Sequence, residues 1–306
     1  MESKEAILKK FGVDQQLLLG KGGEGEVYEI DSGRVLKIYK NPDTDYLQGL
    51  MQFQKQLNDL SLPFAVPQIT ELGEGYSIEK RLQGQTLDKV FPSLNKDEQK
   101  TALTNYFQVM KKINNIEFPD SKFGQVLSNV DAVQTESWPE FLTRKMDQEV
   151  EKSGEYLRND VTDFDNKLAR LKQLIVNETD TSEKYLVHAD YYLNNVLVDD
   201  NMDVTAVLDF SIHTLVGDPR LDAASILFLT MDKNIKPEQI EMIYQLAETE
   251  YGVGTRRILD IYGMYYSIYY SSTHDHDPDS YKWCINNLNN EETWSRFEPP
   301  FIHKDF

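Results

Sequence analysis

Hydrophobic and polar residues alternate in short runs over the first 82 residues, and turn residues separate these runs. Alternation with a period of two is typical of β-strands. Five such runs occur, at residues 16–19, 27–30, 35–39, 68–72 and 76–82. Between the third and fourth runs, residues 43–60 repeat apolar side chains at helical spacing. The pattern predicts a small five-stranded antiparallel sheet with one helix, preceded by a short amphipathic helix at residues 3–11.

From residue 86 onward the apolar positions recur mostly at helical spacing. Helices are predicted near residues 96–115, 138–158, 161–177, 237–250, 255–271 and 279–293. One β-like stretch, residues 185–210, interrupts them, with two strands joined by the turn Asp199–Asn201. We therefore expect an α+β chain with a β-rich lobe at residues 1–82 and a mainly helical lobe at residues 83–306.

The composition excludes several classes of protein. The chain has 306 residues, one cysteine and a formal charge of −19, so it is neither a disulfide scaffold nor a natural partner for nucleic acid. No run of apolar residues is long enough for a membrane span, and the first residues lack the features of a signal peptide. We expect a cytoplasmic protein with no membrane partner. The acidic charge is read first as a solvated surface, with attraction of a cationic small molecule as the alternative.

A glycine cluster joins the first two predicted strands. Its pattern is Gly20-x-Gly22-x-x-Gly25-x-Val27. A dinucleotide-binding fingerprint would lead from a strand into a helix, whereas this one leads from a strand into a strand. Glycines at such a turn let backbone N–H groups approach phosphate oxygens without a Cβ in the way. An ordinary hairpin turn with extra glycines is the alternative.

Lys37 lies on the next predicted strand, in the run Val35-Leu36-Lys37-Ile38. Because side chains alternate along a strand, Lys37 points away from its apolar neighbours. A lysine one strand beyond a phosphate-binding loop could neutralise the α- and β-phosphates of a nucleotide. A lysine that merely faces solvent is the alternative.

The run from Leu186 to Val198 carries the strongest signal. Asp190 and Asn195 stand five residues apart before a predicted strand, and Asp209 ends the next strand. Phosphoryl transfer needs a carboxylate to accept the proton of the attacking hydroxyl. It also needs oxygen ligands that hold Mg²⁺ against the phosphates. Two Asp-rich turns without function are the alternative.

In these motifs the chain resembles the aminoglycoside phosphotransferase and choline kinase-like family, whose fold is that of protein kinases. The matching stretches are, in chain order, Gly20–Val27, Lys37, Val66–Pro67, Glu79–Thr86, His188–Val198, Asp209 and Gly217–Asp222. Residues 188–228 look most like the hygromycin phosphotransferase branch, with His-Ala-Asp in place of His-Gly-Asp and a doubled asparagine.

The resemblance implies a bilobal kinase-like fold and a role for each matching residue. Asp190 would be the catalytic base, and Asn195 and Asp209 the Mg²⁺ ligands. Lys37 would contact the α- and β-phosphates of ATP, or of another nucleoside triphosphate, under the glycine loop. The backbone from Glu79 to Leu82, with Glu79 and Arg81 as the named residues, would bind the adenine edge. Three further residues would be structural, namely His188, Asp218 and Asp222.

The sequence departs from the family at the partner of the strand lysine. Family members usually pair it with a helix glutamate, but residues 43–60 contain none. Gln48, Gln52 or Asp45 could bind Lys37 instead. Ala189 also stands where protein kinases have an arginine that reads a phosphorylated activation loop, and no Ala-Pro-Glu element follows Asp209. A small-molecule acceptor is therefore favoured over a protein.

Two other clusters invite a functional interpretation. Five tyrosines share one predicted helix, at positions 262, 265, 266, 269 and 270. Core packing is the first interpretation, and an aromatic wall for a cationic or sugar acceptor is the alternative. The run His274–Asp279 has residues that could bind a metal, but we expect a solvated loop, with an acidic lip for a cationic substrate as the alternative.

These motifs together predict ATP- and Mg²⁺-dependent transfer of a γ-phosphoryl group to a hydroxyl of a small molecule. An aminoglycoside or similar cationic amino sugar is the leading acceptor. Choline-like or other metabolite hydroxyls are the alternative acceptors, and a nucleotide-binding pseudokinase is the alternative class of protein.

Overall fold

The computed structural model describes residues 2–127, 132–226 and 235–298. It divides into two compact units. The first contains residues 1–112, 126–132 and 193–214, and the second contains residues 113–125, 133–192 and 215–306. The first unit includes the whole predicted β-rich lobe, whereas the division into lobes at residue 82 stays a prediction.

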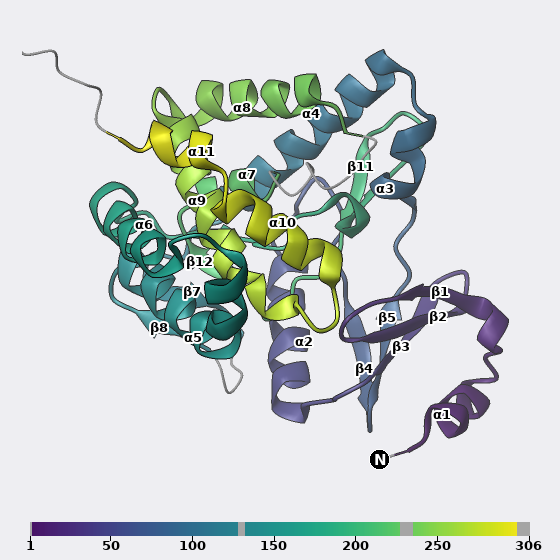
Figure 1. Cartoon of the computed structure of the whole chain (residues 1–306). Coiled ribbons are helices and arrows are strands. Elements are labelled where there is room, and N and C mark those ends of the chain that lie inside the picture. Colours follow the sequence, from purple (N-terminus) through teal and green to yellow (C-terminus); the bar gives the residue numbers. More distant parts are fainter. Residues whose placement is uncertain (1, 128–131, 227–234, 299–306) are drawn as a thin grey trace, which may run out of the picture. The chain divides into compact units, whose positions relative to one another are not determined.

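The first unit is built on a five-stranded antiparallel sheet, as the alternating pattern predicts (Figure 1). Its strands are β1 (Leu18–Lys21), β2 (Gly25–Asp31), β3 (Arg34–Tyr39), β4 (Ile69–Gly73) and β5 (Tyr76–Lys80). Their order in the sheet is β1-β2-β3-β5-β4. Helix α1 (Lys4–Phe11) precedes the sheet, and helix α2 (Thr44–Asn58) connects β3 with β4.

The two faces of β3 have different surroundings. Leu36 and Ile38 are buried in a core cluster with Ile7 and Leu8 of α1. Lys37 lies between them in sequence, so its side chain projects from the opposite face of the sheet. The register places Lys37 between Val27 of β2 and Ser77 of β5. The alternation of the strand therefore fixes which face carries the lysine.

A hairpin from much later in the chain completes the first unit. Strands β10 (Val196–Val198) and β11 (Val204–Val207) pair antiparallel, and β6 (Gln85–Thr86) adds to β10. Ala206 also forms a bridge with Ala65. Two short helices and one long helix follow β6, namely α3 (Leu87–Val90), η2 (Phe91–Ser93) and α4 (Lys96–Ile113). The segment with Asn195 and Asp209 thus belongs to the same unit as Lys37.

The second unit is mainly helical and contains a small sheet of order β8-β7-β12-β9. The strands are β7 (Phe123–Gln125), β8 (Gln134–Thr135), β9 (Tyr185–Val187) and β12 (Leu215–Gly217). The helices are α5 (Trp138–Asp160), α6 (Phe164–Glu178), α7 (Arg220–Ser225), α8 (Pro237–Tyr251), α9 (Thr255–Tyr269), α10 (Pro278–Leu288) and α11 (Glu291–Arg296). Each of the six predicted helical segments overlaps an observed helix, and α9 lies almost entirely in the core.

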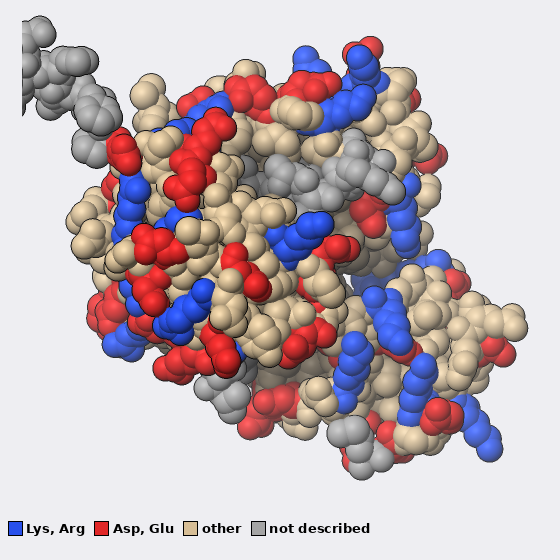
Figure 2. Space-filling model, in the orientation of Figure 1, with Lys and Arg blue, Asp and Glu red and all other residues tan. Residues whose placement is uncertain are grey.

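Acidic and basic side chains are mixed on the face that Figure 2 shows. This mixture agrees with the interpretation of the charge as a solvated surface. Among the described residues, no helix has both the length and the apolar character that crossing a membrane requires.

Candidate active site

The glycine loop between β1 and β2 is tied to the end of β3. The Gly22 N–H donates to the Gly25 carbonyl oxygen at 2.9 Å. Lys40, just after β3, donates its own N–H to the Glu24 carbonyl oxygen at 2.9 Å and its Nζ to the Gly22 carbonyl oxygen at 2.9 Å. These bonds give the loop a defined position over the sheet.

Different constraints explain the glycines of this loop, strand packing at one position and open space for a ligand at the others. A Cβ on Gly25 would lie 2.1 Å from the carbonyl oxygen of Ile38, so the packing of β2 against β3 requires glycine there. A Cβ on Gly20 or Gly22 would meet no atom of the chain within 4 Å. Internal packing therefore does not demand glycine at these two positions, whereas the approach of a phosphate group to the backbone would. The loop fits a bound nucleotide.

Lys37 pairs with a residue of the glycine loop rather than with α2. Its Nζ lies 2.7 Å from Oε2 of Glu24, and the hydroxyl of Tyr46 on α2 donates to Oε1 of Glu24 at 3.1 Å. The lysine Nζ also lies 5.1 Å from the ring centroid of Tyr39. The expectation that Gln48, Gln52 or Asp45 holds Lys37 is therefore wrong.

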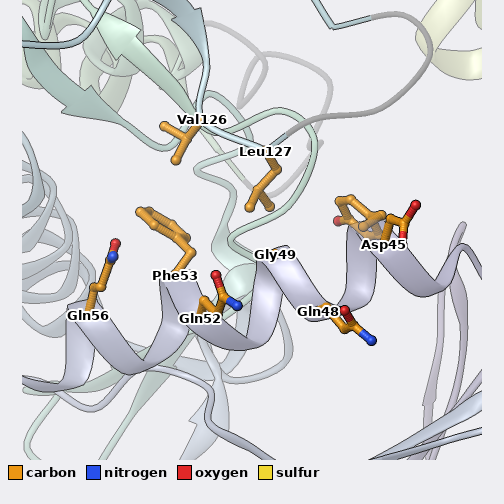
Figure 3. Close-up of a pocket in the computed structure, with 9 residues that line it drawn as sticks. Asp45, Gln48, Gly49, Gln52, Phe53, Gln56, Val126 and Leu127 are labelled. Carbon is orange, nitrogen blue, oxygen red and sulfur yellow. The ribbon is translucent and has the colours of Figure 1, made fainter.

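Those three α2 residues line a hollow instead. It has a volume of about 430 Å³ and lies between α2 and the segment with Val126 and Leu127 (Figure 3). Helical spacing places Gln48 and Gln52 one turn apart along this hollow. The sequence correctly places them on α2, but it does not reveal that Glu24 of the glycine loop is the residue that pairs with Lys37.

Asp209 lies within electrostatic range of Lys37. Burial lowers the pKa of Lys37, but interactions with Glu24, Tyr39, Asp209 and Glu79 outweigh it and raise the pKa above its ordinary value. Burial raises the pKa of Asp209, and the charge of Lys37 opposes that rise. The structure therefore brings together the predicted phosphate-binding lysine and a predicted metal ligand, 172 positions apart in the sequence numbering.

Asn195 and Asp209 lie at the same end of the β10–β11 hairpin. The Leu208 N–H donates to the Asn195 carbonyl oxygen at 2.8 Å, one residue before Asp209. The Asn195 side chain is buried, and Asp209 has a φ of +58°. An amide oxygen and a carboxylate are hard ligands that suit Mg²⁺, and a cation would offset the cost of burying the Asp209 charge. These residues fit the implied Mg²⁺ ion, which in phosphoryl transfer takes its remaining ligands from phosphates and water.

The loop that carries Asp190 is held by a buried carboxylate. Asp222 accepts hydrogen bonds from the N–H groups of His188, at 2.9 Å, and Ala189, at 2.7 Å. Asn114 donates its side-chain amide to the same carboxylate at 2.7 Å. The Asp190 N–H in turn donates to Nδ1 of His188 at 3.3 Å. His188 and Asp222 thus act as the scaffold that the resemblance implies.

Asp218 lies in a separate network of hydrogen bonds in the second unit. It forms an ion pair with Arg220 at 2.6 Å and accepts a hydrogen bond from the Tyr262 hydroxyl at 2.6 Å. The indole Nε1 of Trp138 donates to that hydroxyl at 2.9 Å. None of these side-chain atoms is among the buried polar atoms that lack a partner in the described part of the chain, which is usual for a buried polar network. Asp218 is therefore structural, as the resemblance implies.

The five tyrosines of α9 and its end fall into two groups. Tyr262, Tyr265 and Tyr266 are buried, which agrees with core packing. Tyr269 and Tyr270 are half-buried and lie near the Asp190 loop, where the Tyr270 hydroxyl donates to the Ala189 carbonyl oxygen at 3.3 Å. Burial raises the pKa of both tyrosines, and the charge of Asp190 adds to the rise. Only this second group stays a candidate for an aromatic acceptor wall.

Two peptide N–H groups of the predicted adenine edge, those of Lys80 and Arg81, already donate to carbonyl oxygens of the chain. The Lys80 N–H donates to Gln68 at 3.0 Å, and the Arg81 N–H donates to Gly33 at 2.9 Å. The Arg81 guanidinium pairs with Glu29 at 2.5 Å. An adenine contact through Arg81 would therefore use its carbonyl oxygen, and the roles of Glu79 and Arg81 stay predictions.

The run His274–Asp279 shows no metal-binding arrangement. The ring of His274 lies 3.8 Å from that of Tyr156, centroid to centroid, and also contacts Tyr281. Across the described ranges, no group of three or more His, Cys, Asp or Glu residues could hold a metal ion. Residues 275–279 are exposed, as the solvated-loop interpretation expects, but the His274 side chain is only 11% exposed and Pro278 begins α10.

A glycine loop, a half-buried lysine and an Asn–Asp pair in one unit are groups that a site for nucleotide phosphates would use. Comparison with known proteins agrees. The family model described as "Phosphotransferase enzyme family" matches residues 16–258, well over half of the chain. The chain therefore belongs to the phosphotransferase enzyme family.

One curated relative and several solved structures are similar to this chain. Hygromycin-B 4-O-kinase of Escherichia coli is 26% identical over 232 residues, which are 72% of this chain and 64% of that enzyme, just under two thirds of its length. A thermostable mutant of aminoglycoside phosphotransferase APH(4)-Ia, in its apo form, is 21% identical with a TM-score of 0.71. That match covers 97% of this chain and 100% of the other.

A more distant structure has the same architecture. The gentamicin complex of APH(2")-IIa is 19% identical, with a TM-score of 0.63 over 94% of this chain and 96% of the other. Likeness at this level of identity shows the fold. The expected α+β, kinase-like fold, with antiparallel strands first and mostly helices later, is thus confirmed.

Proposed function

We propose that this protein is a kinase that moves the γ-phosphoryl group of ATP, with Mg²⁺, to a hydroxyl of an aminoglycoside. The observation that carries the proposal is the grouping of Lys37 and Asp209 with Glu24 of the glycine loop. Membership of the phosphotransferase enzyme family supports the same reaction class.

Each residue has a distinct part in the proposed reaction. Backbone N–H groups of the glycine loop bind phosphate oxygens, and the Lys37 ammonium neutralises the α- and β-phosphates. Asn195 and Asp209 hold Mg²⁺, which when bound screens the charge of the phosphate oxygens. Asp190 accepts the proton of the acceptor hydroxyl as its oxygen attacks the γ-phosphorus, and the bond from that phosphorus to the β-phosphate oxygen breaks, so that ADP leaves. Placement and charge neutralisation supply most of the catalysis in such transfers.

Three observations support an aminoglycoside as the acceptor. The similar proteins include a hygromycin-B kinase and an APH(4)-Ia variant in a ternary complex with ADP and hygromycin B. The half-buried Tyr269 and Tyr270 lie beside the loop with Asp190, where aromatic rings could stack on a sugar or face an ammonium group. A net charge of −19 also favours a polycationic substrate electrostatically.

A panel assay tests the proposal. Purified protein is incubated with Mg²⁺-ATP and hygromycin B, gentamicin, streptomycin or choline, and with no acceptor. ADP release is followed, and mass spectrometry identifies the phosphorylated product. We expect release that depends on at least one aminoglycoside. A product with choline alone would replace the proposed acceptor class, and nucleotide binding without any product would favour the pseudokinase alternative.

A further inference from the structure

We infer that Glu24 of the glycine loop is the positioning residue for Lys37, in the role that relatives give to a helix glutamate. This inference rests on the nucleotide-binding part of the proposed function. The sequence motifs give Glu24 no role, because it stands at an unspecified position, x, of the pattern Gly20-x-Gly22-x-x-Gly25.

Glu24 bridges three structural elements. Its two carboxylate oxygens bind different partners, Oε2 the Nζ of Lys37 on β3 and Oε1 the hydroxyl of Tyr46 on α2. Its own carbonyl oxygen accepts the Lys40 N–H. The side chains of Glu24 and Lys37 are only 31% and 17% exposed, so this pair is better shielded from water than a surface ion pair.

The protonation states favour a stable charged pair. Burial by itself raises the pKa of Glu24, but the Lys37 charge and the hydrogen bonds from Lys37 and Tyr46 outweigh it, and the pKa lies below its ordinary value. Burial raises the pKa of Tyr46, and the Glu24 charge adds to the rise, so the phenol keeps its proton and donates it. Glu24 is thus ionised at neutral pH, with a donor on each side.

Helix α2 reaches the lysine through Tyr46 rather than through a carboxylate of its own. The helix contains no glutamate, and its acidic residue Asp45 is exposed. Because Tyr46 holds one oxygen of Glu24, the other oxygen has a fixed direction toward Lys37. The lysine therefore depends on the position of the glycine loop, so that one rearrangement of the loop changes both phosphate-binding groups together.

Variants of the bridge test the inference through nucleotide binding alone. Calorimetric titration with Mg²⁺-ATP compares Glu24→Ala, Glu24→Gln and Tyr46→Phe with the unaltered protein. We expect Kd to rise about tenfold for Glu24→Ala, equivalent to 1.4 kcal/mol. Glu24→Gln keeps one hydrogen bond and is expected to bind ATP with an intermediate Kd. For Tyr46→Phe, which keeps the carboxylate, we expect a smaller loss than for Glu24→Ala.

Glu178→Ala provides a matched control. Glu178 also forms an ion pair, at 2.6 Å to Arg257, and its side chain is 25% exposed, but it lies at the end of α6 in the second unit. We expect its Kd for ATP to stay within about twofold of the unaltered value. The melting temperature of each variant shows whether it folds. If Glu24→Ala does not fold, the Kd of Glu24→Gln for ATP tests the inference in its place.

A double-mutant cycle with Lys37→Ala decides whether Glu24 acts through the lysine. We expect Lys37→Ala to weaken ATP binding at least tenfold and the further change Glu24→Ala to have almost no effect in that background. An equal loss in both backgrounds would overturn the inference. Tighter ATP binding by Glu24→Ala would also overturn it, because the carboxylate would then compete with phosphate for Lys37. The titrations use no acceptor, so they are independent of the panel assay. A panel assay without any product would refute the proposed reaction but not the role of Glu24.

Discussion

Asp222 and Ala189 are joined by a hydrogen bond of 2.7 Å, in which the N–H of Ala189 donates to Oδ1 of Asp222. Ala189 has a φ of +59°, in the left-handed region that residues with a Cβ rarely adopt. The buried carboxylate therefore holds the residue before Asp190 in a strained conformation. Such strain persists only where the surroundings determine the backbone.

Ala189→Gly tests this strain. Glycine adopts the left-handed conformation without a steric cost, although it also gives the unfolded chain more freedom. We expect a gain of up to about 1 kcal/mol in the free energy of unfolding, seen as a higher melting temperature. Ala6→Gly, at an exposed site in α1, is the control and should lose about 1 kcal/mol. A clear loss of stability in Ala189→Gly would contradict the strain.

Asp222→Ala tests the scaffold of the Asp190 loop. The change leaves the N–H groups of His188 and Ala189 and the amide of Asn114 without their buried acceptor. We expect a loss of about 3 kcal/mol or more in the free energy of unfolding, measured by urea titration. Asp165→Ala, which removes an exposed partner of Arg158, should cost less than about 1 kcal/mol. Similar losses in the two variants would refute a special role for Asp222.

Asp209→Ala tests the proposed metal site. Removing the carboxylate takes away the charged ligand and leaves Asn195 alone, so we expect ATP to bind equally with and without Mg²⁺. Calorimetric titrations in Mg²⁺ and in EDTA measure the difference. Asp200→Ala, in the exposed turn of the same hairpin, should keep the gain from Mg²⁺. If Asp209→Ala keeps the full gain, the metal is held elsewhere.

Asp190→Asn tests the proposed base. Asparagine preserves size and hydrogen bonding but cannot accept a proton at neutral pH. Positioned general bases contribute about 10²–10⁴ in rate, so turnover with a confirmed aminoglycoside should fall by about that factor. ATP affinity should change little, because the proposed nucleotide contacts come from other residues. Unaltered turnover would remove Asp190 from the mechanism.

The regular spacing of apolar residues allows most of the fold to be predicted from the sequence. Each predicted helix covers several turns, and the alternation of Leu36, Lys37 and Ile38 correctly places the lysine opposite the α1 core. Strands β7, β8 and β12 went unpredicted because two or three residues show no period. They are strands only because neighbouring strands supply hydrogen-bond partners.

The sequence predicts only part of the site, because contacts between distant segments leave no periodic pattern in it. Motif spacing identifies Lys37 and Asp209 as candidates, but the partner of Lys37 depends on how a loop folds over β3. The one available signal was an acidic residue, Glu24, within the glycine run. A side-chain bridge between a loop, a strand and a helix has no fixed spacing in sequence, so no periodic pattern reveals it.

The unit that contains Lys37 is discontinuous in the chain. Its first 112 residues are complete well before residues 193–214, which carry Asn195 and Asp209. During synthesis, a ribosome releases the glycine loop and the lysine long before the hairpin that ends at Asp209. The nascent protein must therefore carry the complete five-stranded sheet without the β10–β11 hairpin while residues 113–125 and 133–192 of the second unit are being made. Under the proposed roles, affinity for the metal–nucleotide complex arises late in translation, when this hairpin pairs with β6, which was made much earlier.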